Sequence, residues 1–193
     1  MLLETKRLLL KPYNQDYAEM IFPVVSQFEI SDTMIAIPHP YPRQAVHQWI
    51  DYLEKSAEQG TAFEFAIFSK DHTENYIGNC GLVSISKSHQ KAEIAYFIDK
   101  KQWGKGYATE AALLMIEYGF EKLGLERIYG HCMSRNPASR KVMEKIGFKF
   151  EGTLRHAIKK DDVFEDIDLL GMTRSDFDLM KKKLADLSRL NRS

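Results

Sequence analysis

The sequence has little cysteine, no net charge and no long apolar run, and each of these shortages excludes classes of protein. Cys80 and Cys132 are its only cysteines and lie outside any C-x-x-C arrangement, so neither a disulfide framework nor a zinc site is predicted. The 27 basic residues equal the 27 acidic ones, which argues against a broad surface for duplex nucleic acid or membrane lipid. No stretch approaches the roughly 18 apolar residues of a spanning helix, and the start lacks a signal-peptide pattern. A cytoplasmic protein is therefore expected.

What is present suits one globular domain. The chain has 193 residues, of which 44% are hydrophobic and 28% charged, the usual balance of a soluble globular protein. No repeat, low-complexity stretch or linker divides it, so residues 1–193 are expected to form a single domain. Its six histidines are scattered without the spacing of metal ligands, and no metal site is predicted.

The first half of the chain alternates between strand and helix patterns. Asn14 is predicted to cap a short helix that Pro23 ends, and an apolar face from Val46 onward predicts a helix that stops at Gly60. Three prolines exclude regular structure in residues 37–42. Alternating apolar residues predict strands at 7–11, 63–67 and 76–85.

The second half contains one strand–helix–strand unit and then closing strands. Further strands are predicted at 93–98, 127–132, 148–154 and 163–172, and helices at 107–123, at 137–146 and from Ser175 onward. The last helix is expected to turn Phe177, Met180, Leu184 and Leu187 inward. The order of these elements predicts an α/β (α+β) fold, a mixed, mostly antiparallel twisted sheet of about seven strands with helices on both faces.

The stretch Trp103-Gly-Lys-Gly-Tyr-Ala-Thr-Glu-Ala111 joins a predicted strand to a long helix. Gly104 and Gly106 allow a turn whose amides point outward beside a helix N-terminus, an arrangement that suits a pyrophosphate. A glycine pair that serves only a tight turn is an equally good explanation of this stretch alone. A Rossmann site is disfavoured because Thr109 stands where the third glycine belongs, and no Gly-Lys-Ser/Thr of a P-loop follows.

Two longer motifs extend this observation. Ala92-Glu-Ile-Ala-Tyr-Phe97 precedes Gln102-Trp-Gly-Lys-Gly-Tyr-Ala-Thr-Glu-Ala111, and Asn136-Pro-Ala-Ser139 precedes Lys145-Ile-Gly-Phe148. In this order they resemble the two motifs of the GNAT acetyltransferase superfamily, most closely its Rim-type branch of ribosomal-protein N-terminal acetyltransferases. Trp103 departs from the usual Gln or Arg, and an aromatic residue there is typical of Rim-type members.

The resemblance implies a splayed strand pair, near Ile98 and Arg127, that holds acetyl-CoA as the acetyl donor. The pantetheine arm would pair with the backbone of Phe97 and Ile98, and the pyrophosphate would rest on the amides of residues 104–109. The cofactor-binding residues implied in this way are Phe97, Ile98, Trp103, Gly104, Lys105, Gly106, Tyr107, Ala108, Thr109, Asn136 and Ser139.

Glu93 is the first candidate for a base that takes the proton of the acceptor amine, directly or through a water. Strand alternation puts it on one face with Ala95 and Phe97, where an apolar setting would raise its pKa. A solvent-facing carboxylate or a salt-bridge partner explains Glu93 equally well. His131 and Cys132 end a strand nearby, and local packing is the simpler explanation of both.

Ser139 is the candidate donor of a proton to the leaving thiolate. Many superfamily members have a tyrosine four residues later, but here that residue is Met143. Both Ser139 and Asn136 have structural explanations as well, because Asn136 before Pro137 is a good helix N-cap.

We therefore expect acetyl transfer to a primary amine, with a protein or peptide N-terminus as the leading acceptor. At pH 7 roughly a tenth of an α-amine is neutral, against a few ten-thousandths of a lysine side chain. An α-amine therefore needs a weaker base to become reactive. A polyamine or aminoglycoside acetyltransferase, a non-catalytic acetyl-CoA sensor and a homodimeric assembly stay open. A dense acidic pocket would favour polyamines, and the acidic residues near the expected mouth are Glu151, Asp161, Asp162, Glu165, Asp166 and Asp168.

Overall fold

An eight-stranded sheet in the order β1-β2-β3-β4-β5-β6-β8-β7 organises the chain. The computed structural model describes the backbone of residues 1–190, and all their side chains except those of 184, 185 and 187–190. The strands are β1 (Leu3–Glu4), β2 (Leu8–Pro12), β3 (Phe63–Ser69), β4 (Tyr76–Ser86), β5 (Lys91–Ile98), β6 (Arg127–Met133), β7 (Lys149–Lys160) and β8 (Val163–Thr173). Neighbouring strands are antiparallel except β5 and β6, which are parallel. The mixed, mostly antiparallel sheet is confirmed, and the strand beyond the expected seven is the two-residue β1.

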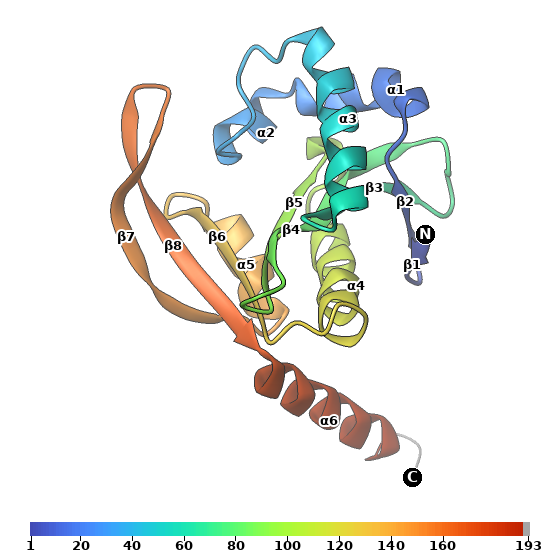
Figure 1. The fold of residues 1–193 in the computed structure, drawn as a ribbon, viewed down its shortest axis with the longest axis vertical. Coiled ribbons are helices and arrows are strands. Elements are labelled where there is room, and N and C mark those ends of the chain that lie inside the picture. Colours follow the sequence, from blue (N-terminus) through green and yellow to red (C-terminus); the bar gives the residue numbers. More distant parts are fainter. Residues whose placement is uncertain (191–193) are drawn as a thin grey trace.

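Helices cover both faces of the sheet (Figure 1). They are α1 (Ala18–Val25), α2 (Phe28–Thr33), α3 (Arg43–Gln59), α4 (Tyr107–Glu121), α5 (Pro137–Lys145) and α6 (Arg174–Leu190), with 3-10 turns η1 (Gln15–Tyr17) and η2 (Lys100–Gln102). Helices α1 and α3 pack on one face through the cluster around Ile21, Ile50 and Phe68. Helix α4 packs on the other through Met115 and Ile116, which are fully buried and each stabilise the fold by about 1.5–3 kcal/mol.

Helix α1 differs from its prediction. Asn14 does accept a hydrogen bond from the Asp16 amide at 3.0 Å, but the turn it caps is η1, and α1 begins afterwards at Ala18. Pro23 lies inside α1, whose last residue is Val25, rather than ending it. Pro23 removes one backbone donor from α1, and the buried apolar side chains of the helix offset that loss.

Two other helices also differ. Helix α2 was not predicted, because its six residues are too few to show a periodic apolar face. Helix α6 begins at Arg174 rather than Ser175: Asp176 accepts from the Thr173 amide at 3.1 Å, and Thr173 Oγ1 accepts from the Asp176 amide at 3.3 Å. Phe177 is buried and Met180 half-buried, as predicted, whereas the side chains of Leu184 and Leu187 lie outside the described residues.

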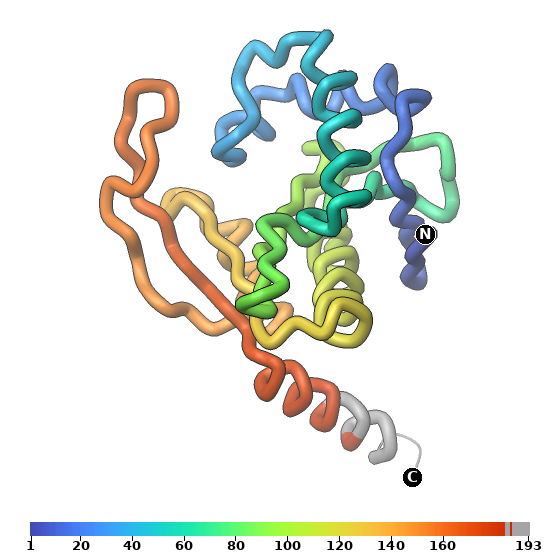
Figure 2. Tube along the Cα trace, in the orientation of Figure 1, coloured from blue at the N-terminus to red at the C-terminus, as the bar shows by residue number. Residues whose placement is uncertain are grey.

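The β7–β8 hairpin forms one edge of the sheet, and its tip reaches the level of α2 (Figure 1 and Figure 2). In the part of the chain that the structure describes, no helix combines the length and apolar character needed to cross a bilayer.

Candidate active site

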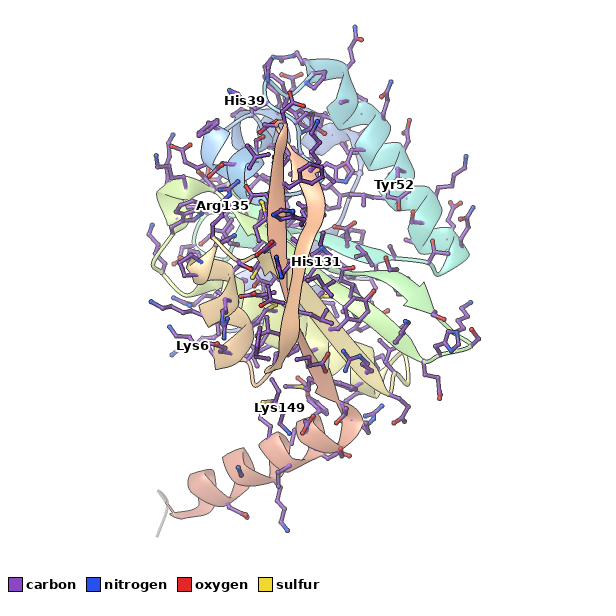
Figure 3. All side chains as sticks on the ribbon, turned by 90° about the vertical axis from the view of Figure 1, so that its left-hand side faces the viewer. Lys6, His39, Tyr52, His131, Arg135 and Lys149 are labelled. Carbon is purple, nitrogen blue, oxygen red and sulfur yellow. The ribbon has the colours of Figure 1, made fainter. Side chains whose placement is uncertain are left out.

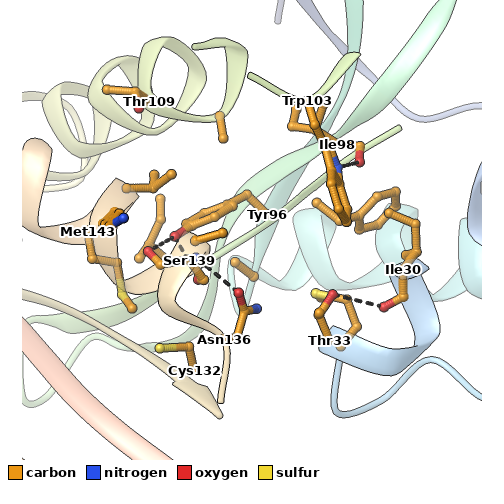
Figure 4. Close-up of a pocket in the computed structure, with 18 of the residues that line it drawn as sticks. Ile30, Thr33, Tyr96, Ile98, Trp103, Thr109, Cys132, Asn136, Ser139 and Met143 are labelled. Atoms are coloured by element: carbon orange, nitrogen blue, oxygen red, sulfur yellow. Dashed lines mark hydrogen bonds between the residues drawn. The ribbon is translucent and has the colours of Figure 1, made fainter. Parts of the chain in front are cut away.

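The parallel strands β5 and β6 separate after a short paired segment. Pairing runs from Lys91↔Arg127 to Glu93↔Tyr129 and does not continue toward Ile98. The opening is a cavity of about 670 Å3 (Figure 4), lined by both strands, the start of α4, helix α5 and the segment from α2 toward α3. The splayed pair predicted from the sequence is therefore present.

The turn before α4 is built to present backbone amides. Gly104 and Gly106 have φ values of 77° and 80°, in the left-handed region that favours glycine. A Cβ on Gly104 would have no neighbour within 4 Å, so the conformation, and not crowding, requires glycine. Gly106 is the N-cap of α4 and supplies no side-chain cap, which leaves the first-turn amides free for an anion. The turn fits the pyrophosphate of acetyl-CoA.

Trp103 ties this turn to the end of β5. Its Nε1 donates to the Ile98 carbonyl oxygen at 2.6 Å, and its side chain is 47% exposed at the mouth of the cavity (Figure 4). Arg7 holds the other side of the turn, donating to the Lys105 carbonyl at 2.9 Å and to Glu110 at 2.6 Å. The Lys105 side chain itself bonds Gln102 at 2.7 Å.

The cavity brings together most of the predicted cofactor residues. Those that line it are Phe97, Ile98, Trp103, Gly104, Gly106, Tyr107, Ala108, Thr109, Asn136 and Ser139. Lys105 does not line it. Two lysines of α5 that sequence reasoning missed, Lys141 and Lys145, do line it and carry the charge that phosphates need.

Ser139 lies at the first turn of α5 beside a tyrosine of β5. Asn136 is the N-cap as predicted, its Oδ1 accepting from the Ser139 amide at 3.1 Å. The Tyr96 hydroxyl donates to the Ser139 carbonyl oxygen at 3.0 Å and lies 2.9 Å from the Ser139 hydroxyl (Figure 4). Burial raises the pKa of Tyr96, so this hydroxyl is neutral. Met143, at the position where the resemblance implies a tyrosine, is buried.

On the opposite face of the sheet, Glu93 of β5 meets His131 of β6. Glu93 Oε1 lies 2.9 Å from His131 Nδ1, and the side chains are 18% and 29% exposed. The hydrogen bond to Glu93 raises the pKa of His131 above 6.5, against the effect of burial. Figure 3 shows His131 where β6 runs beside β8. Glu93 thus has a partner in His131, as its second explanation supposes, and both side chains line the cavity.

A second carboxylate, Glu64 of β3, lies on the same face. Register aligns Glu64 with Gly81 and Ala95, two residues from Glu93 along β5. A Cβ on Gly81 would lie 2.5 Å from Glu64 Cγ, so glycine there leaves room for this side chain. Burial raises the pKa of Glu64, against the hydrogen bond that Asn79 donates at 2.6 Å, and the charge of Glu93 adds to the increase. The sequence analysis did not single out Glu64, although an acidic residue between Phe63 and Phe65 in a predicted strand could have indicated it.

One side of the cavity, where we expect the acceptor, is closed by the segment from α2 toward α3, here called the acceptor wall (residues 30–37). Lys160, at the end of β7, donates to the carbonyls of Met34 at 3.0 Å and Ile37 at 2.8 Å. Arg135 donates to the Asp32 carbonyl at 2.8 Å and to Glu165 at 2.7 Å. The β7–β8 hairpin therefore holds the acceptor wall in place.

The acidic residues expected near the mouth are used elsewhere. None of the six predicted acidic residues is among the described residues that line the cavity. Glu151 pairs with Arg127, Asp162 with Lys159, and Asp168 accepts from Ser134, Thr153 and Arg140. Within the described part of the chain, no group of histidine, cysteine or carboxylate side chains is arranged to hold a metal ion.

A splayed parallel strand pair, an amide turn and a cavity between them define an acyl-CoA-dependent transferase. The chain belongs to the GNAT acetyltransferase family: the family model described as "Acetyltransferase (GNAT) domain" matches residues 7–149. It is an acetyl-CoA-dependent N-acetyltransferase. The N-acetyltransferase p20 of Bacillus licheniformis is 30% identical over 175 residues, which cover 91% of this chain and 97% of p20.

Relatives and structural neighbours differ in the acceptors their names give. The spermidine N(1)-acetyltransferase of Escherichia coli is 39% identical over 75 residues, 39% of this chain and 40% of that protein. The fold is similar to that of the ribosomal α-N-protein acetyltransferase RimL in complex with coenzyme A, with a TM-score of 0.83 at 15% identity over 90% of this chain and 98% of that one. The spermidine N-acetyltransferase of Vibrio cholerae has a TM-score of 0.78 at 22% identity over 90% and 99% of the two chains.

Proposed function

We propose that this N-acetyltransferase acts on the α-amino group of a protein or peptide N-terminus. One observation carries the proposal: among the described residues that line the cavity, Glu93 is the single carboxylate. The neighbouring acceptor wall contributes mainly apolar side chains, including Ile30, Met34 and Ile35. An extended polycation needs several carboxylates to replace its water, whereas one α-ammonium with a pKa near 8 needs one counter-charge and a modest base.

The proposed roles follow the positions of the residues. Acetyl-CoA supplies the acetyl thioester. The backbone of Phe97 and Ile98 borders the pantetheine arm, residues 104–109 hold the pyrophosphate, and Trp103 fixes the turn. Glu93 provides negative charge on the acceptor side, and Ser139 donates a proton to the leaving thiolate.

The comparisons support this acceptor in part. A Bacillus subtilis relative named as a putative ribosomal N-acetyltransferase is 38% identical over 91 residues, and RimL has the same fold. Spermidine acetyltransferases are also among the relatives, so a polyamine is the second candidate acceptor. Glu64 favours it, because this carboxylate has no cationic partner among the described side chains and lies near Glu93.

The test is thiol release from acetyl-CoA with a panel of amines. Peptides that begin with alanine or serine are compared with the same peptides blocked at the N-terminus but carrying an internal lysine, and with spermidine and an aminoglycoside. Turnover of free N-termini and not of blocked peptides supports the proposal. Turnover of spermidine alone would show that the second candidate acceptor is correct. Turnover of the aminoglycoside alone would show an antibiotic-modifying enzyme. Tight acetyl-CoA binding by calorimetry without turnover of any amine identifies a sensor.

A further inference from the structure

The carboxylate expected to act as the base already has a partner. Glu93 Oε1 lies 2.9 Å from Nδ1 of His131, a hydrogen-bond distance. When the imidazole is neutral, an Nδ1–H that donates to a carboxylate leaves the lone pair on Nε2. The strands fix this geometry, because Glu93 is paired with Tyr129 at the last rung before β5 and β6 separate, and His131 is the first residue beyond it on the same face.

The imidazole is also the more open member of the pair. Its side chain is 29% exposed against 18% for Glu93, and both line the cavity. No hydrogen bond to Nε2 occurs among the described residues, whereas Nδ1 is occupied by Glu93. Nε2 is therefore the ring nitrogen of His131 that is left without a partner among the described residues, at a side chain that lines the cavity.

We infer that His131 takes the proton from the acceptor ammonium and that Glu93 is the positioning residue that orients and charges its imidazole. This inference rests on the proposed function, in that it assumes an amine acceptor, but it does not depend on which amine is used. It changes the role of Glu93, which acts through His131 and not on the amine itself.

The protons and bonds of the proposed reaction balance. Nε2 of His131 takes one proton from the ammonium, and the neutral amine attacks the thioester carbonyl. The C–N bond forms, the C–S bond breaks with its electron pair going to sulfur, and the nitrogen loses its second proton to solvent. Ser139 protonates the thiolate and regains a proton from solvent, and His131 releases its own. The net change is an ammonium and acetyl-CoA giving an amide, CoA and one proton.

The surroundings of His131 favour such a base. The hydrogen bond and charge of Glu93 raise its pKa, which brings it closer to that of an α-amine. The other titratable groups on this face are Tyr129 of the same strand and Glu64 of β3. From β8, the residues aligned with His131 and Met133 are Leu169 and Ile167, which are uncharged. Glu93 therefore dominates the charge that His131 meets.

The test compares pH profiles of kcat/KM for one amine that the wild-type protein acetylates, in His131→Ala, Glu93→Gln and the control His89→Gln. His89 is exposed in the turn before β5 and remote from the cavity. The acceptor ionises identically in every variant, so only differences between profiles are interpreted. We expect His131→Ala to lose about 10²–10⁴-fold at neutral pH and to regain activity with added imidazole. Glu93→Gln should shift the acidic limb to lower pH, and His89→Gln should match wild type.

The opposite pattern overturns the inference: a Glu93→Gln variant that is inactive at every pH beside a His131→Ala variant with near-normal, imidazole-insensitive turnover. If the wild-type protein acetylates no amine, the proposed function fails separately. The pairing then still has its own test, NMR titration of the His131 imidazole, assigned by its loss in His131→Ala. A pKa above 6.5 that falls in Glu93→Gln supports the pair, and a pKa unchanged by that substitution refutes it.

Discussion

The hydroxyl groups of Tyr96 and Ser139 lie 2.9 Å apart, although one belongs to a strand and the other to a helix 43 residues later. Met143 of α5, the position where the resemblance expects a tyrosine, is buried and offers no proton. Tyr96 brings a phenol to the cavity from β5 instead. The Ser139 hydroxyl is thereby oriented by a tyrosine of the β5 motif and not by a residue of its own helix.

Removing the Ser139 hydroxyl should slow the chemical step. We expect Ser139→Ala to lower kcat about 10–100-fold at unchanged KM for acetyl-CoA, because a general acid typically contributes 10²–10⁴-fold and water replaces part of it. Tyr96→Phe should give a smaller loss, and the double variant should resemble Ser139→Ala, since Tyr96 acts through Ser139. Steady-state kinetics on the four proteins checks this; turnover unaffected by Ser139→Ala would remove Ser139 from the mechanism.

Substituting Gly104 should weaken acetyl-CoA binding more than folding. An alanine at φ 77° costs about 1–2 kcal/mol and meets no atom within 4 Å, but its methyl group would stand beside the amides that we propose hold the pyrophosphate. Gly124→Ala is the matched control, because Gly124 has φ 64° and equally open surroundings beyond the end of α4. Urea denaturation should show similar losses for both, whereas calorimetry should show weaker acetyl-CoA binding for Gly104→Ala alone.

Neutralising Glu64 should change how stability depends on pH. The pKa of Glu64 is raised in the folded state, so the folded protein binds more protons at this carboxyl than the unfolded chain does. The contribution of Glu64 to stability therefore falls as the pH rises from the unfolded pKa, about 4.3, through the raised folded value. Glu64→Gln retains an oxygen to accept from Asn79 and removes that dependence. We expect the variant to equal or exceed wild type in free energy of unfolding at pH 8 and to lose this advantage at pH 5. Urea titrations at both pH values check it, and a variant less stable at pH 8 would contradict it.

Freeing the acceptor wall should affect the acceptor and not the donor. Lys160→Met retains the length of a buried side chain but leaves two backbone carbonyls without their donor, at a cost of about 1–3 kcal/mol. We expect a raised KM for the amine, an unchanged affinity for acetyl-CoA and a lower melting temperature. Lys159→Met, which removes only an exposed pair with Asp162, is the control. Equal effects on both substrates would show that the wall does not select the acceptor.

The donor side of the site could be predicted from the sequence far better than the acceptor side. Gly104, Gly106 and Asn136 act through local backbone geometry, and a turn or cap depends on residues within a few positions of one another. Glu64 and His131 contribute through sheet register, which joins residues remote in the chain. In the sequence, Glu64 is only an acidic residue between two phenylalanines, and His131 is only a residue near the end of a strand.

The same distinction applies to the fold. Most of the longer helices and strands followed from their apolar periods, whereas α2 is too short to have one. Strand β7 runs six residues beyond its predicted end at 154, because its mostly exposed residues show no apolar alternation. Pro23 lies inside α1, where the buried apolar side chains of the helix offset the backbone donor that proline removes, and this packing could not be seen from the sequence.

The contacts of Lys160 have a consequence for redesign. They join positions 123 and 126 residues apart, so this side of the cavity is assembled from two segments that lie far apart in the sequence. A chimera that takes only the β7–β8 hairpin from a relative would place that relative's residue, a lysine or not, opposite the unchanged carbonyls of the acceptor wall. A change of acceptor amine by segment exchange therefore requires the acceptor wall and the β7–β8 hairpin to be exchanged together.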